Sequence, residues 1–216
     1  MPARSGRSSH APESIRPRHA RTPPGPEFLP AHASGILACD FFPCDTVLLT
    51  RLSCVAVAEH AHRRIHILGV TAHPTADWVA QQAHTLLREL DDHVAQFTFV
   101  IRDRDSKFTS MFDAVVASEG IQIVKTPIRA PRANAVMERW IGSLRRELLD
   151  RILILNARHL RHALAEYKHH FTTHRPHRSP DHTAPLRALP QPETTNTKII
   201  RCDRLGGAIH EYLQVA

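Results

Sequence analysis

Residues 97–110 read FTFVIRDRDSKFTS, an apolar run followed at once by two acids, Asp103 and Asp105. The aromatic and β-branched residues of FTFVI are typical of a buried strand. A carboxylate at the exit of such a strand loses much of its hydration, which is costly unless a cation or a hydrogen-bond donor compensates. The stretch therefore predicts a core strand and a binding partner for the acids that follow it.

The sequence on both sides of this strand predicts a layered α/β domain. Three strand-like segments precede it, at 36–42, 51–61 and 63–73, and their spacing favours an antiparallel meander. A helix with Thr75 as its N-cap follows them. The remaining expected elements are helices over 110–118, 134–152 and 157–171, and a short strand over 121–124. Because antiparallel strands come first and crossover helices later, this order predicts a mixed sheet with helices on its faces.

Composition divides the chain into three parts. Residues 1–33 combine Pro, Ser, Gly and Arg without a hydrophobic period, which predicts a flexible basic arm. Residues 34–186 carry the periodic segments and form the expected core domain, and residues 187–216 are left as a C-terminal tail. A chain of 216 residues is long enough to bury one main core.

The charge balance indicates a polyanionic partner. Lys and Arg total 28 against 21 Asp and Glu, which gives a net charge of +7 and a pI near 9.8. Nucleic acid is the leading partner class, and the alternative is a soluble protein that is simply rich in arginine. The four cysteines form no CxxC pair, which favours a reducing compartment. No apolar stretch approaches the roughly 20 residues of a membrane span, so we expect a cytoplasmic protein without a membrane partner.

Three acids lie where a carboxylate needs an explanation: Asp40 inside ILACDFF, Asp103 after FTFVIR, and Glu138 one turn into the helix that begins near Asn134. Two explanations compete. Either each acid pairs with a nearby arginine, at 102, 104 or 139, or all three converge on divalent cations. One metal site would account for all three acids at once. A pair of Mg²⁺ or Mn²⁺ ions needs such a set of carboxylates to support an in-line displacement at phosphorus.

The sequence segments around these acids resemble the successive motifs of the integrase core shared by retroviral integrases and insertion-sequence transposases of the DDE type. They are ILACDFF, IRDRDSKFTS, PRANAVMERWIGSLRREL and HFTTHRPHRSP, and the resemblance extends over residues 27–186. In that family two strand aspartates are followed, about 35 residues after the second, by a glutamate on a helix. From Asp103 to Glu138 the step is 35 positions.

The resemblance implies a ribonuclease H-like fold, with a five-stranded mixed sheet and helices on both faces. It implies that Asp40, Asp103 and Glu138 are the catalytic residues and the ligands of two Mg²⁺ or Mn²⁺ ions. The implied activity is DNA 3′-end cleavage followed by strand transfer. The implied partners of the protein are the element ends, the target DNA and further copies of the chain, which would form a homo-oligomer on that DNA. The implied location is bacterial and nucleoid-associated. Asp105 and Asp45, by contrast, are interpreted as turn residues.

Basic and polar residues around Glu138 are candidate DNA contacts. Lys125, Arg129 and Arg132 flank the prolines of KTPIRAPR, a segment that resembles the flexible active-site loop of the family. Contacts from such residues to phosphates should be independent of sequence and should weaken with salt. Further candidates on the following helix are Asn134, Arg139, Arg145 and Arg146. An N-cap role for the asparagine and a solvated helix face for the arginines remain the alternatives.

The histidines after the last helix form a separate group, His170, His174 and His177. An HxxxH spacing would place two metal ligands on one face of a helix. Pro176 and Pro180 argue against a helix in this stretch, so a phosphate or partner contact is preferred over a metal.

Two other functions remain open. The first is a catalytically inactive transposase remnant that binds DNA non-specifically, because no obvious helix-turn-helix or zinc-binding motif precedes the core. The second is a stand-alone ribonuclease H or junction nuclease of the same fold. The sequence motifs favour an integrase over a nuclease. Product analysis would distinguish the two, because only a recombinase joins DNA strands.

Overall fold

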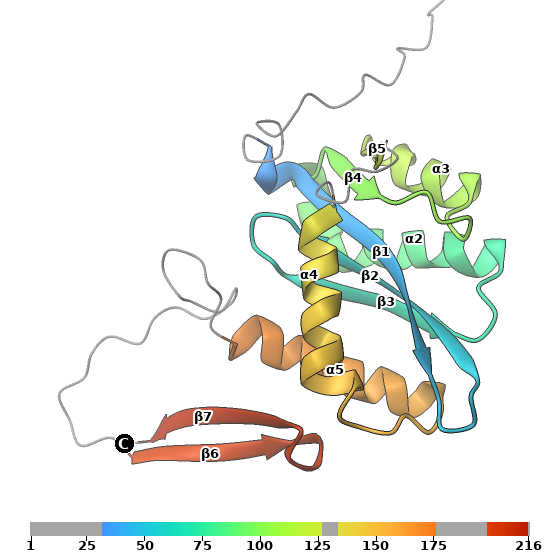
Figure 1. The fold of residues 1–216 in the computed structure, drawn as a ribbon. Coiled ribbons are helices and arrows are strands. Elements are labelled where there is room, and N and C mark those ends of the chain that lie inside the picture. Colours follow the sequence, from blue (N-terminus) through green and yellow to red (C-terminus); the bar gives the residue numbers. More distant parts are fainter. Residues whose placement is uncertain (1–31, 127–133, 176–197, 216) are drawn as a thin grey trace, which may run out of the picture.

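The computed structural model describes residues 32–126, 134–175 and 198–215. Its centre is a five-stranded sheet in the order β3-β2-β1-β4-β5 (Figure 1). The strands are β1 (Ile36–Asp45), β2 (Arg51–Glu59), β3 (Ile65–Thr71), β4 (Phe99–Arg102) and β5 (Gln122–Lys125). The first three form the predicted antiparallel meander, whereas β4 is parallel to both β1 and β5. The sheet is therefore mixed, as the element order predicted.

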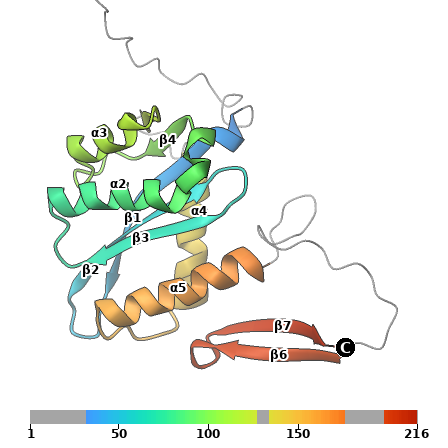
Figure 2. The same cartoon turned by 180° about the vertical axis from the view of Figure 1, so that it is seen from behind.

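Helices cover both faces of this sheet. Figure 1 shows α4 crossing in front of the strands, and Figure 2 shows α2 on the opposite face. The helices are α2 (Ala76–Leu90), α3 (Ser110–Ser118), α4 (Ala135–Leu144) and α5 (Ala157–Thr173). This arrangement confirms the predicted fold class, a ribonuclease H-like sheet between two helical layers. Within the described ranges, no helix combines the length and apolarity needed to cross a bilayer.

Alternation along β1 divides its side chains between two cores. One face packs against α2 and α3 through Leu37, Cys39 and Phe41. The opposite face packs against α4 and α5 through Ala38, Phe42 and Cys44. Since successive side chains of a strand point to opposite faces, Asp40 lies on the same face as Ala38 and Phe42. The carboxylate in the middle of β1 is therefore turned towards the helix that carries Glu138.

Local signals set most helix boundaries near their predicted positions. The hydroxyl oxygen of Thr75 accepts a hydrogen bond from the Trp78 amide (3.3 Å) and caps α2 as predicted. Gly120 follows α3 with a φ of +78°, a conformation that glycine adopts readily. The prediction of one helix over 134–152 is wrong at its C-terminal end. There α4 passes into a π-helical turn, Arg145–Leu149, which ends the helix three residues early.

The last described residues form a hairpin of β6 (Lys198–Arg204) and β7 (Ile209–Val215). It lies beside α5 in both ribbon views (Figures 1 and 2). Ile209 is buried in the same core cluster as the inner side chains of α5, and Arg204 Nη1 lies 3.2 Å from Glu166 Oε2. The region expected to be a tail thus contributes a hairpin that packs on the core, while the predicted basic arm lies almost entirely outside the described residues.

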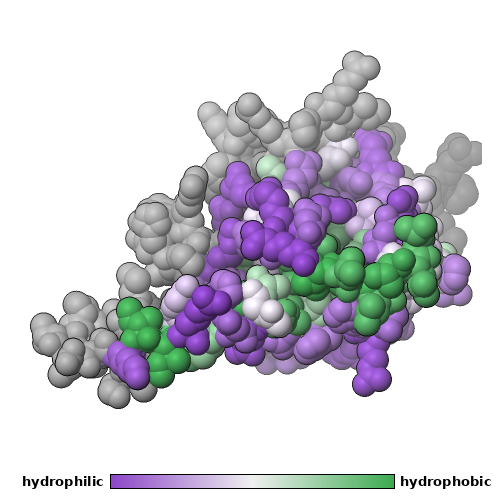
Figure 3. Space-filling view, turned by 60° about the horizontal axis from the view of Figure 1, so that its bottom comes forward, coloured by the Kyte–Doolittle hydropathy of each residue, from purple (hydrophilic) through white to green (hydrophobic). Residues whose placement is uncertain are grey.

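An apolar patch is exposed where the β1–β2 turn meets the segment before α5 (Figure 3). Its side chains include Leu48, Leu49 and Leu153, which are 81%, 88% and 76% exposed. The amide of Val47 donates to the carbonyl of Ile154 (2.8 Å), so the two segments are joined. Contiguous apolar surface of this kind is typical of contact areas.

Candidate active site

The parallel pairing of β1 with β4 brings two of the predicted acids together. Cys39 is opposite Arg102 in this register. The next residues along the two strands are Asp40 and Asp103, so the two acids lie on adjacent strands at the same level. Both residues are half-buried.

Arg102, the nearest arginine in sequence, does not neutralise either acid. Its guanidinium binds the Asp113 carboxylate of α3 at two points, with Nε–Oδ1 at 2.9 Å and Nη2–Oδ2 at 2.6 Å. Its Nη1 donates to the backbone carbonyl of Asp103 (2.9 Å). Because Arg102 is directed to the α3 face, alternation directs the side chain of Asp103 to the α4 face, where Asp40 also points.

Two contacts fix the first turns of α4 over β1. Asn134 Nδ2 donates to the carbonyl of Cys39 (3.3 Å), and the Trp140 ring packs edge-on against Phe42 with centroids 5.8 Å apart. Glu138 lies between these two anchors, in the first turn of α4, and is exposed. Asn134 occupies the N-cap position, as predicted, but its side chain makes no cap hydrogen bond and reaches the sheet instead.

The acids act on one another electrostatically. Burial raises the pKa of Asp40 to about 7, with the negative charges of Asp103, Glu138 and Asp105 adding to the effect. A hydrogen bond from the Phe41 amide to Asp40 Oδ1 (2.8 Å) opposes this shift but does not cancel it. The neighbouring carboxylates thus disfavour the ionisation of Asp40, and a cation among them would relieve the repulsion.

The described residues favour a shared cation over separate arginine pairs. Arg102 is held by Asp113, and Arg104 Nε donates to the carbonyl of Thr126 (3.1 Å). Within the described ranges, no lysine or arginine forms an ion pair with the acids in question, Asp40, Asp103 and Glu138. The explanation that each acid pairs with its own arginine therefore has no support among the described residues.

The donor set suits Mg²⁺ or Mn²⁺. Both ions prefer hard oxygen ligands, and the three carboxylates supply them from two strand positions and a helix. The buried Oδ1 of Asn134, which has no hydrogen-bond partner among the described residues, adds an oxygen one helical turn before Glu138. The three carboxylates are not all within 4.8 Å of one another in this part of the chain, so common binding requires movement of at least one of their side chains.

Asp105 and Asp45 have other partners. Asp105 accepts hydrogen bonds from the Lys107 amide (2.9 Å) and from its Nζ (2.7 Å). Burial alone would raise the pKa of Asp105, but Lys107 outweighs it and lowers the pKa. The Asp105 amide also donates to Asp103 Oδ1 (3.0 Å), so Asp105 forms the predicted turn and orients Asp103. Asp45 is the last residue of β1, rather than beyond the strand as expected, and it pairs with Arg51 at 2.9 Å.

Basic candidates lie on both sides of Glu138. Lys125 ends β5 and is exposed, with its Nζ 3.5 Å from Asp113 Oδ2. Arg139 is exposed on α4. Burial and, to a smaller extent, the positive charge of Arg139 lower the pKa of Arg63 in the β2–β3 turn. Sequence reasoning missed Arg63, since nothing in the turn indicates that it meets α4. Two further predicted contacts lie outside the described residues, Arg129 and Arg132.

Arg145 and Arg146 stand at the other end of α4. Arg145 Nη2 donates to the carbonyl of Pro43 (3.0 Å), and Arg146 Nη2 lies 3.5 Å from Ser143 Oγ. Arg145 follows Glu138 by seven positions, a rise of about 10 Å at 1.5 Å per residue. Arg145 therefore anchors α4 to β1, and any DNA contact from this pair would be distant from the acids.

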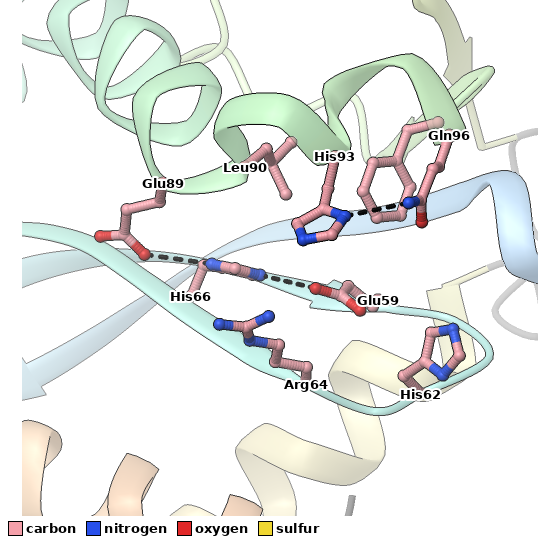
Figure 4. Close-up of a pocket in the computed structure, with 9 residues that line it drawn as sticks. Glu59, His62, Arg64, His66, Glu89, Leu90, His93 and Gln96 are labelled. Carbon is pink, nitrogen blue, oxygen red and sulfur yellow. Dashed lines mark hydrogen bonds and ion pairs between the residues drawn. The ribbon is translucent and has the colours of Figure 1, made fainter. Parts of the chain in front are cut away.

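A separate pocket of about 210 Å³ opens at the β3 edge of the sheet (Figure 4). At its base His66, only 3% exposed, lies between two carboxylates: Nε2 is 3.0 Å from Glu59 Oε1 and Nδ1 is 3.0 Å from Glu89 Oε2. Burial alone would lower the pKa of His66, but the two carboxylates outweigh it and raise the pKa. The pocket contains none of the three acids, so it is a structural ion-pair site and not part of the candidate active site.

We expect Asp40→Asn to raise the free energy of unfolding at pH 8 in EDTA. The pKa of Asp40 is about 7 in the folded chain, against about 3.9 in an unfolded one, so its contribution to stability is present below about pH 4 and lost as the pH rises through 7. Urea denaturation should show a gain of about 1–2 kcal/mol at pH 8 and a smaller one at pH 5. Asp45→Asn, on the same strand, should give no gain, and equal gains in both variants would contradict this account.

His66 should also make a contribution to stability that is lost as the pH rises. Because its folded-state pKa is raised above the usual value of about 6.5, its ion pairs contribute fully below that value and are lost as the pH rises through the folded pKa. His66→Gln should therefore destabilise the chain by about 1–3 kcal/mol at pH 6 and by less at pH 9. The exposed His93→Gln, from the same pocket, serves as the control in thermal unfolding. A pH-independent loss in His66→Gln would show that the histidine is not charged in the folded chain.

Residues 119–185 match the family model described as the integrase core domain. This segment includes Asn134 and Glu138, whereas Asp40 and Asp103 precede it. Among curated protein sequences, none matches the chain significantly.

The fold has counterparts among solved structures. A chain of the simian T-cell lymphotropic virus intasome, solved in complex with PP2A regulatory subunit B56 gamma, has a TM-score of 0.55 and 12% identity, over 85% of this chain and 67% of that one. The HTLV-2 integrase catalytic core domain, solved in complex with magnesium, has a TM-score of 0.51 and 12% identity, over 70% of this chain and 93% of that one. The mixed sheet, its two helical layers and the matched segment agree with the resemblance read from the motifs: the chain has the fold of integrase catalytic cores, and residues 119–185 are similar to the integrase core domain.

Proposed function

We propose that this chain is the catalytic core of a DDE-type transposase or integrase, which cleaves DNA at the 3′ ends of an element and joins them to target DNA. The observation that carries the proposal is the convergence of Asp40, Asp103 and Glu138 on one face of the sheet without a basic partner among the described residues.

Asp40, Asp103 and Glu138 are the proposed ligands of two Mg²⁺ or Mn²⁺ ions. Such ions, when bound, activate an attacking oxygen and stabilise a leaving oxygen at phosphorus. The protein contributes position: β1 and β4 hold the two aspartates at one level, and the contacts of Asn134 and Trp140 hold the helix of Glu138 over them. The same carboxylates would serve cleavage and strand transfer, because both are displacements at phosphorus.

The proposed DNA contacts lie around this site. Arg139 follows Glu138 on α4, and its charge acts on Arg63. Neither arginine forms an ion pair with an acid in the described ranges, so a phosphate would relieve their repulsion. Lys125 is exposed at the end of β5, and Asn134 lies at the start of α4. DNA contacts from Arg145, Arg146 and the loop residues Arg129 and Arg132 remain predictions.

Assembly and location are also part of the proposal. Joining two DNA ends requires at least two catalytic cores, and the apolar patch that includes Leu48, Leu49 and Leu153 is a surface that copies of the chain could share. The division into an arm, a core and a tail, and a bacterial, nucleoid-associated location, remain predictions.

A joining assay tests the reaction. The chain is incubated in Mn²⁺ with supercoiled plasmid and a labelled oligonucleotide that carries a free 3′-hydroxyl, and the label attached to plasmid is measured. Asp40→Asn, Asp103→Asn and Glu138→Gln should each lower joining by on the order of 10³-fold, because each removes an oxygen ligand. Asp105→Asn should stay within about tenfold of wild type.

The other outcomes separate the alternatives. Joining that persists in the three variants contradicts the proposed site. Nicking without joining favours a nuclease, and a folded chain that binds DNA without nicking or joining favours the inactive remnant.

Replacing both Arg63 and Arg139 with Gln should weaken DNA binding uniformly across sequences. Each lost phosphate contact should lower the dependence of log Kd on log salt by about 1, measured by fluorescence anisotropy from low to moderate salt. Arg88→Gln, an exposed arginine on α2 across the sheet, is the matched control. An unchanged salt dependence in the double variant would place the DNA elsewhere.

A further inference from the structure

The C-terminal end of α5 meets the β6–β7 hairpin at a cluster of polar side chains. His170 lies in the last turn of α5, His169 directly precedes it, and His174 is the C-cap residue. Pro176 and Pro180 were expected to exclude a helix near these histidines, but α5 continues to Thr173. Glu211 of β7 faces them from the hairpin, and β7 lies beside α5 in both ribbon views (Figures 1 and 2).

Glu211 is the buried centre of this cluster. Its side chain is 1% exposed, and Oε2 accepts a hydrogen bond from Arg204 Nε (3.0 Å). Oε1 is buried without a hydrogen-bond partner among the described residues, with His170 Nδ1 at 3.5 Å. A buried carboxylate oxygen without a hydrogen-bond donor is costly, so a second cation at Oε1, in addition to Arg204 at Oε2, would be stabilising.

Two imidazoles complete a group with metal-ligand chemistry. His174 Nε2 lies 3.6 Å from Glu211 Oε2, and the rings of His169 and His174 are 5.5 Å apart. One ligand atom from each of His169, His174 and Glu211 lies within 4.8 Å of the other two. In a tetrahedral zinc site, bonds of about 2.1 Å place neighbouring ligand atoms about 3.4 Å apart. The cluster is therefore near the size of such a site before any ion contracts it.

We propose that His169, His174 and Glu211 bind a divalent transition-metal ion of the Zn²⁺ class and thereby clamp the hairpin to α5. Two imidazoles and one carboxylate suit Zn²⁺, Co²⁺ or Ni²⁺ better than Mg²⁺, which prefers oxygen ligands alone. The site joins residues from a helix end and from a strand more than thirty positions later, so metal binding is coupled to docking of the hairpin.

This proposal goes beyond the proposed DNA chemistry and does not depend on it. The measurement therefore uses the full chain with Asp40→Asn, Asp103→Asn and Glu138→Gln combined, which removes the other candidate metal site. Zn²⁺ is titrated by calorimetry, and Co²⁺ by its visible absorption. We expect one ion per chain and a Co²⁺ spectrum of a four- or five-coordinate site.

Variants of the cluster provide the decisive comparison. His169 is exposed, so His169→Gln should fold normally and lower the Zn²⁺ affinity at least about tenfold. His174→Gln should do the same, whereas His162→Gln, exposed on the same helix, should leave the affinity unchanged. Circular dichroism confirms folding of each variant.

Hydrogen exchange links the metal to the hairpin. Zn²⁺ should slow exchange of the β7 amides in the chain with an intact cluster and not in His169→Gln. Absence of stoichiometric Zn²⁺ binding, or equal affinity in His169→Gln and His162→Gln, overturns the proposal and leaves Glu211 as the centre of an ion-pair network with Arg204 and the histidines.

Discussion

The parallel pairing of β1 with β4 is the constraint on which the candidate site depends. With Cys39 opposite Arg102, the following residues, Asp40 and Asp103, must leave neighbouring strands at one level. The two-point contact of Arg102 with Asp113 then determines the face, because it holds the arginine on the α3 side and leaves the aspartates on the other. A shift of one residue in this register would separate the two carboxylates and turn one of them into an apolar core.

This arrangement has a cost that the rest of the fold must offset. Burial of Asp40, together with the charges of Asp103 and Glu138, makes its ionisation unfavourable enough to raise its pKa to about 7. The two apolar cores on either side of the sheet hold the strands in place despite this repulsion. Structural strain of this kind is typical of functional sites, where a ligand present during function compensates for it.

Much of the fold could be predicted because its signals are local. FTFVIRDRD contains both the strand and the acid at its exit, and Thr75 marks a helix start. The step of 35 positions from Asp103 to Glu138 matches the spacing in the family that the motifs resemble, and so it connects the strand aspartate with the helix glutamate. The acids themselves could be identified by where they interrupt apolar runs. The π-helical end of α4 could not be predicted, because the sequence of Arg145–Leu149 continues the pattern of an ordinary α-helix. The electrostatic influence of Arg139 on Arg63, and the ion pairs of Glu211 with the end of α5, depend on tertiary packing alone and have no local signal in the sequence.

The most direct test of the central claim is anomalous diffraction from crystals of the wild-type chain grown or soaked in Mn²⁺. The account predicts density for Mn²⁺ between the carboxylates of Asp40, Asp103 and Glu138, with Glu138 rotated towards the strands, and loss of that density in Asp103→Asn crystals of the same form. Well-diffracting crystals in millimolar Mn²⁺ without a peak at these carboxylates, or with the same peak in Asp103→Asn, would contradict it.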